Sequence, residues 1–160
     1  SLNDEIWRKA KRIRTLEENN DNACIPEGRD VEYIGIINYC IMFLIRLEDI
    51  KGIPSVGEIT EKASDFDNID AEVLYAAYKE NVSRIKDLLV KKNTDYGDAW
   101  KSMSIVSMTD QVIIRVYRIR KILSNNGVCL VSEGIASQLN DIINYCIFAL
   151  IKMNSDLISF

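Results

Sequence analysis

The most unusual local string in the sequence is Asp95-Tyr96-Gly97, which is followed three residues later by Trp100. A glycine-terminated turn of this kind could aim a carboxylate and two aromatic rings at a planar ligand, because turns carry functional side chains disproportionately often. The structural alternative is a helix that ends at the glycine, with Trp100 folded back onto the core. The two interpretations are about even, so we treat Asp95, Tyr96 and Trp100 as candidate ligand-binding residues.

A basic group lies further along the chain. Arg115, Arg118 and Lys121 recur at a spacing of three, which places them along one side of a helix. Guanidinium and ammonium groups bind phosphate, so Arg118 and Lys121 are the predicted phosphate-binding residues. A solvated basic face paired with local carboxylates explains the same spacing, and on its own that arrangement is the commoner one.

Glu133 and Asp141 are the candidate catalytic and metal-binding carboxylates. Glu133 precedes an apolar helical run, and Asp141 lies within that run on the face opposite Leu139. If these carboxylates converge with Asp95 and Arg118 between helices, they would form a polar cleft able to bind Mg²⁺ and a phosphate. An interhelical network of ion pairs that sets the helix register is the competing interpretation.

Asn144-Tyr145 is the strongest repeated polar signal, because it also occurs as Asn38-Tyr39. Burying an asparagine costs free energy unless its amide is hydrogen-bonded. The two asparagines could therefore bond each other, or a neighbouring helix end, across a pseudo-two-fold axis. Asn144 could equally read the amide or base edge of a ligand, and we include it among the binding residues.

The composition excludes several kinds of chemistry. None of the 160 residues is histidine, which rules out Ser-His-Asp and Cys-His catalysis and His-ligated zinc or haem within the chain. The net charge of −4 predicts no strong nucleic-acid-binding patch. The four cysteines form no C-x-x-C pair, which favours reduced, buried thiols in a cytoplasmic protein. The longest uncharged stretch, 33–45, is too short to cross a bilayer as a helix, so we expect no membrane contact.

The chain also repeats itself. Shifting the sequence by 106 positions aligns residues 1–45 with 107–151 without a gap, and 17 of the 45 pairs are identical. Each copy is predicted to hold two helices, the first capped by Ser1-x-x-Asp4 or by Ser107-x-x-Asp110. No segment alternates like a strand, so the predicted fold is all-α: a pseudo-two-fold helical bundle built from two tandem copies of a two-to-three-helix unit.

These patterns divide one compact domain into three parts. Residues 1–49 form the first copy, 50–69 a connector, and 70–160 the complete second copy. The second copy has a lead-in helix, predicted from Asp70 to about Lys92 with a buried stripe that includes Val82 and Ile85. The first copy begins directly at its capping box, and we expect the native protein to have an upstream lead-in there.

The run from Lys91 to Trp100 (KKNTDYGDAW), together with Arg118-Ile119, Glu133-Gly134 and Asp141-Ile-Ile-Asn144-Tyr145, resembles the nucleotide-modification-associated domain family, type 1. The tandem arrangement is similar to the bacterial branch of that family. The resemblance covers nearly the whole chain. It implies a role connected with modified nucleotides.

A more distant likeness is to the MazG-like all-α nucleoside triphosphate pyrophosphohydrolases, in which E-E-x-x-E and E-x-x-D carboxylates bind Mg²⁺. Here Gln138-x-x-Asp141 stands where E-x-x-D would, and the first copy has Glu32-x-x-Gly35. The metal-binding tetrad of those enzymes is therefore incomplete. At most, the second copy could be active.

The leading hypothesis is a nucleotide-handling domain that binds a nucleotide or another small phosphorylated ligand with Mg²⁺, and that could also hydrolyse it. The rival hypothesis is a non-catalytic helical interaction module that forms a homodimer and uses its polar pairs to set register. The incomplete tetrad favours the rival, and the Asp-Tyr-Gly turn and the family resemblance favour nucleotide handling.

Overall fold

The computed structural model describes residues 1–20, 28–53, 69–126 and 132–155, and every regular element in those ranges is helical. The all-α prediction is therefore confirmed. The elements, in chain order, are α1 (Leu2–Glu18), α2 (Arg29–Leu47), α3 (Ala71–Tyr96), the short 3₁₀ helix η2 (Ala99–Ser102), α4 (Ile105–Asn126) and α5 (Ser132–Ser155).

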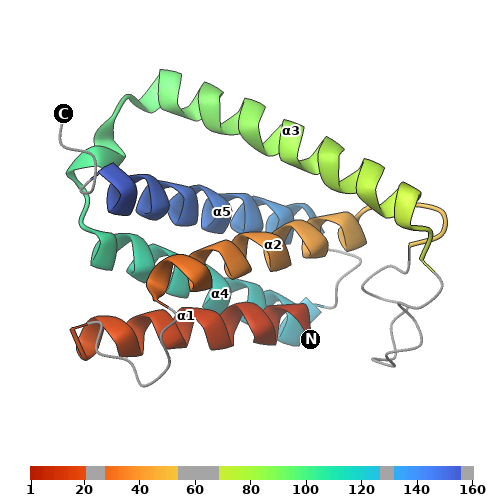
Figure 1. Cartoon of the computed structure of the whole chain (residues 1–160). Coiled ribbons are helices and arrows are strands. Elements are labelled where there is room, and N and C mark those ends of the chain that lie inside the picture. The colour runs from red at the N-terminus through yellow and green to blue at the C-terminus, as the bar shows by residue number, and fades with distance from the viewer. Residues whose placement is uncertain (21–27, 54–68, 127–131, 156–160) are drawn as a thin grey trace.

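The helices are stacked in three layers (Figure 1). Helices α1 and α4 form the outer layer and pack against α2 and α5 respectively, and α2 packs against α5 in the middle layer. Helix α3 forms the third layer, contacts mainly α2, and passes over α5 towards η2. The pairing of α1 with α2 and of α4 with α5 is the arrangement that two tandem copies would give.

The core lies between the outer and middle layers. Helices that are buried on several sides carry apolar residues around most of their circumference, and α2 and α5 follow this rule. Four of these residues are completely buried: Ile36 and Cys40 of α2, and Ile142 and Cys146 of α5. Burial raises the pKa of both thiols well above the ordinary value, so Cys40 and Cys146 are inert, reduced core residues, as predicted.

Helix α5 is also long and apolar enough to cross a membrane by length and composition alone, with a mean hydropathy of 1.2 over its best window. The helix packs against both α2 and α4 and supplies much of the core. Its position in the centre of the bundle accounts for its apolar character.

The first capping prediction is confirmed and the second is wrong. Ser1 accepts a hydrogen bond from the Asp4 amide and forms a full capping box. In α4, however, Ser107 lies inside the helix and its amide donates to Ser104 Oγ at 3.1 Å. Because Ser104 occurs three residues earlier and can cap equally well, the helix begins there, and Asp110 is free to pair with Arg14 of α1.

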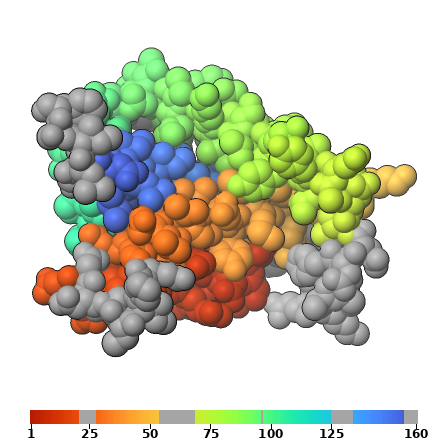
Figure 2. Space-filling view, viewed as in Figure 1, coloured from red at the N-terminus to blue at the C-terminus, as the bar shows by residue number. Residues whose placement is uncertain are grey.

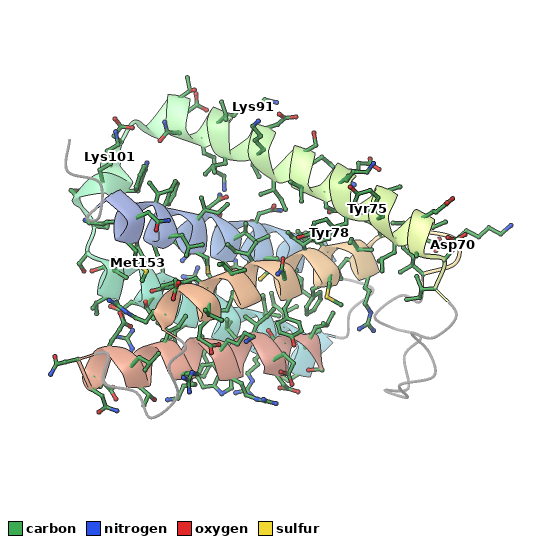
Figure 3. All side chains as sticks on the ribbon, viewed as in Figure 1. Asp70, Tyr75, Tyr78, Lys91, Lys101 and Met153 are labelled. Atoms are coloured by element: carbon green, nitrogen blue, oxygen red, sulfur yellow. The ribbon has the colours of Figure 1, made fainter. Side chains whose placement is uncertain are left out.

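Helix α3 begins at the predicted cap, Asp70, but continues beyond the predicted end. Asn93 to Tyr96 form its last turn, and the helix stops at Gly97, whose φ of 68° suits glycine. Val82, predicted to be buried, is 40% exposed, because α3 packs on α2 through the neighbouring face with Ala77 and Ile85. Figure 3 shows Tyr78 between α3 and α2, where its hydroxyl donates to Asn38 Oδ1 at 2.9 Å.

Most of the predicted connector, and the cysteines Cys24 and Cys129, lie outside the described residues.

Candidate functional site

A cavity of about 330 Å³ lies where α3 and η2 pass over α4 and α5. Figure 2 shows α3 covering this side of the bundle. Helix α3 supplies Lys92 to the cavity, η2 supplies Trp100, α4 supplies Arg115, and α5 supplies Asp141 and Asn144. The cavity is therefore built from residues that are up to 59 positions apart in the sequence, from Leu89 to Phe148.

The charged part of the cavity is a three-residue cluster. Asp141 Oδ1 lies 2.8 Å from Lys92 Nζ, and Asp141 Oδ2 lies 3.4 Å from Arg115 Nε. Arg115 is held further by Gln111, whose side-chain oxygen accepts from its Nη1 at 2.6 Å. Arg115 is only 13% exposed and Lys92 39% exposed. One carboxylate thus faces two cations, which leaves a net positive charge available to an anion.

The aromatic part lies beside η2. The rings of Trp100 and Phe148 are stacked, with centroids 4.5 Å apart and an interplanar angle of 8°. Trp100 Nε1 donates to Asn93 Oδ1 at 3.1 Å, which fixes the orientation of the indole. Tyr145 packs edge-on against Phe148, and the Arg115 guanidinium lies 4.9 Å from the centroid of the Tyr145 ring. The aromatic and cationic groups are therefore in direct contact.

Asn144 lies between these two parts and is 5% exposed. The side-chain carboxamide of Asn144 makes no hydrogen bond to the residues that the structure describes. Asn38, its counterpart in the first copy, is exposed and is bonded to Tyr78. The prediction that the two asparagines could bond each other is therefore wrong. The polar atoms of this carboxamide are open to the cavity, where a ligand or water can form hydrogen bonds with them.

The structure brings together three of the predicted site residues, Trp100, Asp141 and Asn144. Asp95 is exposed in the last turn of α3 and does not line the cavity. Arg118 and Lys121 are exposed on α4 and do not line it either. A spacing of three turns each successive side chain by about 300°, so only Arg115 faces inward and the next two residues drift around the helix.

Tyr96 and Glu133 lie in the last turn of α3 and the first turn of α5, and their side chains are outside the described part of the structure. Glu133 and Asp141 are eight residues apart in one helix, so their Cα atoms are separated by about 12 Å along its axis. That spacing is wider than the i, i+3 and i, i+4 pairs that share one helix face. Among the described side chains, no group of three or more Asp, Glu or Cys is placed to hold a metal ion.

The prediction missed Lys92, Tyr145 and Phe148 as site residues. Arg115 belongs to the basic group from which Arg118 and Lys121 are predicted to bind phosphate, and it is the member of that group that lines the cavity. Lys92 stands one turn before the Asp95-Tyr96-Gly97 string, and Phe148 is one helical turn after Asn144. The useful signal was the i, i+3, i+4, i+7 spacing of Asp141, Asn144, Tyr145 and Phe148, which places all four on one face of α5.

In the first copy, the position that corresponds to Asp141 is packed against a lysine side chain. Glu32, with 6% of its side chain exposed, lies 3.1 Å from both Lys9 Nζ and Arg12 Nε. The Lys9 side chain passes directly over Gly35, where a Cβ atom would lie 2.6 Å from Lys9 Cε. Gly35 stands where the second copy has Asp141. In the first copy, Glu32 is therefore buried against two cations, and the Lys9 side chain occupies the space beside Gly35.

A family profile described as nucleotide modification associated domain 1 matches residues 1–47 and 92–153, which together make up more than half of the chain. The matched segments contain α1, α2, η2, α4 and most of α5, and they include all of the charged and aromatic cavity residues described above. Searches of curated proteins and of solved structures find no match. The chain therefore belongs to the nucleotide modification associated domain 1 family.

Proposed function

We propose that the cavity lined by Lys92, Trp100, Arg115, Asp141 and Asn144 binds a nucleotide. The observation that carries the proposal is Asn144, a carboxamide that is 5% exposed, lines the cavity, and has no hydrogen-bond partner among the described residues. Carboxamides read base edges because they offer one acceptor and two donors. The family description supports a nucleotide as the ligand to test first.

The aromatic part of the cavity suits a base. Trp100, Tyr145 and Phe148 line the cavity together with Asn144. Aromatic rings bind bases by stacking, which contributes about 1–3 kcal/mol per base. A volume of about 330 Å³ lies at the small end of the usual range for ligand pockets. The cavity therefore suits a single nucleoside unit.

The charged part suits a phosphate with Mg²⁺. Asp141 pairs with both Lys92 and Arg115. An entering phosphate would take over these two cations and release the Asp141 carboxylate. Mg²⁺ is commonly held by one or two carboxylates together with substrate phosphates and water, so the released Asp141 could bind a magnesium ion carried by the phosphate.

Binding is tested by calorimetric titration of deoxynucleoside 5′-monophosphates and 5′-triphosphates, with MgCl₂ or with EDTA. We expect saturable binding that Asn144→Leu weakens at least tenfold, because a base edge would lose its partner (about 1.4 kcal/mol or more). Asn38→Leu is the matched control, since it changes the corresponding residue outside the cavity. Equal affinity in the two variants, or no binding to the unmodified protein, rejects the proposal.

Hydrolysis of the bound nucleotide is a second proposal, favoured by the position of Asp141 beside two phosphate-binding cations. Mg²⁺ on the phosphate would lower the pKa of a bound water, and a carboxylate would accept its proton. Glu133 and Asp141 are the proposed carboxylates. Release of pyrophosphate or phosphate with Mg²⁺, absent in Asp141→Ala, supports the proposal, and no release from any bound nucleotide rejects it.

A homodimer through the outer face of α3 is proposed as well. Tyr75 and Val90 expose 62% and 57% of their surface on this helix. If two α3 helices cross antiparallel at Ser83, each Lys79 meets the Asp87 of the other copy, which gives complementary charges. Sedimentation equilibrium tests this: a monomer at tens of micromolar rejects the dimer, and Val90→Lys is expected to convert a dimer to a monomer.

A further inference from the structure

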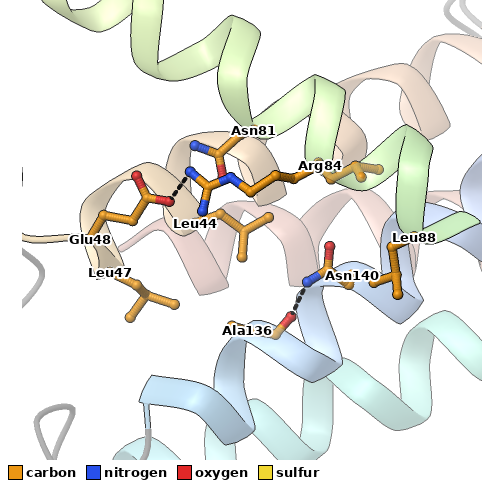
Figure 4. Close-up of a pocket in the computed structure, with 9 residues that line it drawn as sticks. Leu44, Leu47, Glu48, Asn81, Arg84, Leu88, Ala136 and Asn140 are labelled. Carbon is orange, nitrogen blue, oxygen red and sulfur yellow. Dashed lines mark hydrogen bonds and ion pairs between the residues drawn. The ribbon is translucent and has the colours of Figure 1, made fainter.

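A second cavity, of about 400 Å³, lies between α3 and the helices α2 and α5 (Figure 4). On α3 the residues lining the second cavity end at Leu88, and those lining the first begin at Leu89. On α5 the corresponding boundary falls between Asn140 and Asp141. The two cavities are therefore consecutive parts of one groove between α3 and α5, which we call the α3 groove.

The second cavity is apolar with a few polar groups at its edges. Leu44 and Leu47 of α2 and Ile85 and Leu88 of α3 form its walls. At the end near α2, Arg84 Nη2 lies 2.5 Å from Glu48 Oε1, and Figure 4 shows this pair on the side of the cavity away from Asn140. Pairing with Glu48 holds the guanidinium in place, where a planar group could stack on it.

Two carboxamide oxygens in this cavity have no hydrogen-bond partner in the described residues. Asn81 of α3 is 5% exposed, and its Nδ2 donates to Ala77 O at 2.9 Å. Asn140 of α5 donates to Ala136 O at the same distance. Each amide nitrogen is thus engaged by its own helix, and each side-chain oxygen is left as an acceptor. Ring N–H and exocyclic amino groups of a base are donors that would satisfy such acceptors.

The order of groups along the α3 groove defines a ligand. Trp100 and Phe148 lie at one end, Lys92, Arg115 and Asp141 follow, and the leucine-walled cavity with Asn81 and Asn140 lies at the other end. A stacking site, a phosphate site and a second flat apolar site with acceptors therefore occur in sequence. Between the lining residues at its two ends, 136 and 148 on α5, the groove spans about 18 Å.

We infer that the α3 groove binds two nucleosides joined through a phosphate, with the second nucleoside in the cavity between Leu44, Asn81 and Asn140. The inference rests on the proposed function, because it places the first base and the phosphate in the cavity argued above. The α3 residues of the second cavity lie between the two segments that match the family, and its α2 and α5 residues up to Leu47 and from Ala136 lie within them.

The test compares each homodinucleoside monophosphate (dApdA, dCpdC, dGpdG and dTpdT) with its own 5′-mononucleotide by calorimetric titration. Because the two halves of each dinucleotide are alike, the direction of binding does not affect the comparison. We expect at least one dinucleotide to bind tenfold or more tightly than its mononucleotide, since the second nucleoside binds intramolecularly once the first is held.

Ala136→Phe fills the second cavity from α5, and Leu88→Trp fills it from the less buried α3 side. Both variants are expected to abolish the tenfold preference and to leave mononucleotide affinity within twofold of the unmodified protein. Ser137→Phe is the matched control, because this exposed neighbour of Ala136 does not line either cavity. Circular dichroism melting confirms that each variant is folded.

The outcomes separate the two claims. Mononucleotide binding without any gain for the dinucleotides overturns the second subsite and leaves the proposed nucleotide site intact. A dinucleotide preference that survives both cavity-filling variants also overturns the second subsite. No binding of either ligand class rejects both claims together.

Discussion

Lys92 Nζ and Asp141 Oδ1 lie 2.8 Å apart and join α3 to α5 across 49 residues of sequence. Together with the stacked rings of Trp100 and Phe148, this ion pair ties the end of α3 to the bundle. Lys152 of α5 adds a further link, because its ammonium group donates to the carbonyl oxygens of Lys101 and Met103. Lys92, which would bind a phosphate, thus also helps to hold the end of α3 against α5.

Replacing Lys92 separates these two roles. The Lys92–Asp141 pair is partly exposed, so Lys92→Ala should lower the free energy of unfolding by less than about 1 kcal/mol. A charge-assisted hydrogen bond to phosphate contributes about 1.5–3 kcal/mol, so the same variant should lose at least tenfold in nucleotide affinity. Calorimetric titration and urea denaturation measure the two effects.

Lys91→Ala is the control, since Lys91 is the exposed neighbour on the same helix (Figure 3). If the two lysine variants lose affinity equally, the effect is one of overall charge and Lys92 does not bind the phosphate.

Trp100 provides an optical test, because the chain has only two tryptophans, Trp7 and Trp100. A base that packs beside Trp100 should quench or shift its fluorescence, while Trp7 lies on α1 against Tyr117, away from the cavity. We therefore expect Trp7→Phe to keep the nucleotide-dependent fluorescence change and Trp100→Phe to lose it. Retention of the change in Trp100→Phe would place the ligand elsewhere.

The fold was largely predictable because it follows from periodicity. Helical spacing, the Ser1 capping box and the lead-in cap at Asp70 identify the elements and several of their boundaries. The errors arose where two local signals compete. Ser104 and Ser107 are both good helix caps, and the choice between them depends on tertiary contacts such as the pairing of Asp110 with Arg14.

The site was predictable only in part, since it is assembled from four elements. Asp141 and Asn144 were identified because they are polar residues within an apolar helix. The choice of Arg115 rather than Arg118 depends on the rotation of α4, and the role of Lys92 depends on where α3 crosses α5. A sequence pattern within one helix specifies neither the rotation of α4 in the bundle nor the crossing point of α3 and α5.

Replacing Gly35 tests how firmly the Lys9 side chain is held over this residue in the first copy. Alanine in place of glycine in a helix interior stabilises by about 0.5–1 kcal/mol, and the atoms that a new Cβ would meet belong to the flexible end of Lys9. Arg12 still neutralises Glu32 if Lys9 moves away. We expect Gly35→Ala to leave the free energy of unfolding unchanged or to raise it by up to about 1 kcal/mol in urea denaturation. A loss of more than about 1 kcal/mol would show that Lys9 cannot move.

Glu17 should make stability depend on pH. Burial raises the pKa of its carboxyl above the ordinary value, and the opposing effects of Arg14, the Thr109 hydrogen bond and Arg29 are smaller. The folded state thus keeps this proton to higher pH than the unfolded chain does. The contribution of Glu17 to the free energy of unfolding therefore falls as pH rises from the ordinary carboxyl value through the raised one.

Glu17→Gln removes this titration. The free energy of unfolding of the variant, relative to that of the unmodified protein, should therefore be higher at pH 7 than at pH 4. Urea denaturation at both pH values measures the difference, with the exposed Glu18→Gln as the control. A relative loss of stability over the same interval would mean that the ion pairs with Arg14 and Arg29 outweigh the burial of Glu17.

The most direct test of the central claim is a titration of ¹⁵N-labelled protein with deoxynucleoside monophosphates, followed by two-dimensional NMR. The account predicts saturable shifts of the Trp100 indole N–H and the Asn144 carboxamide resonances at the same ligand concentrations, while the Trp7 indole resonance stays in place. Unchanged Trp100 and Asn144 resonances at millimolar nucleotide, or shifts confined to residues outside the α3 groove, would contradict it.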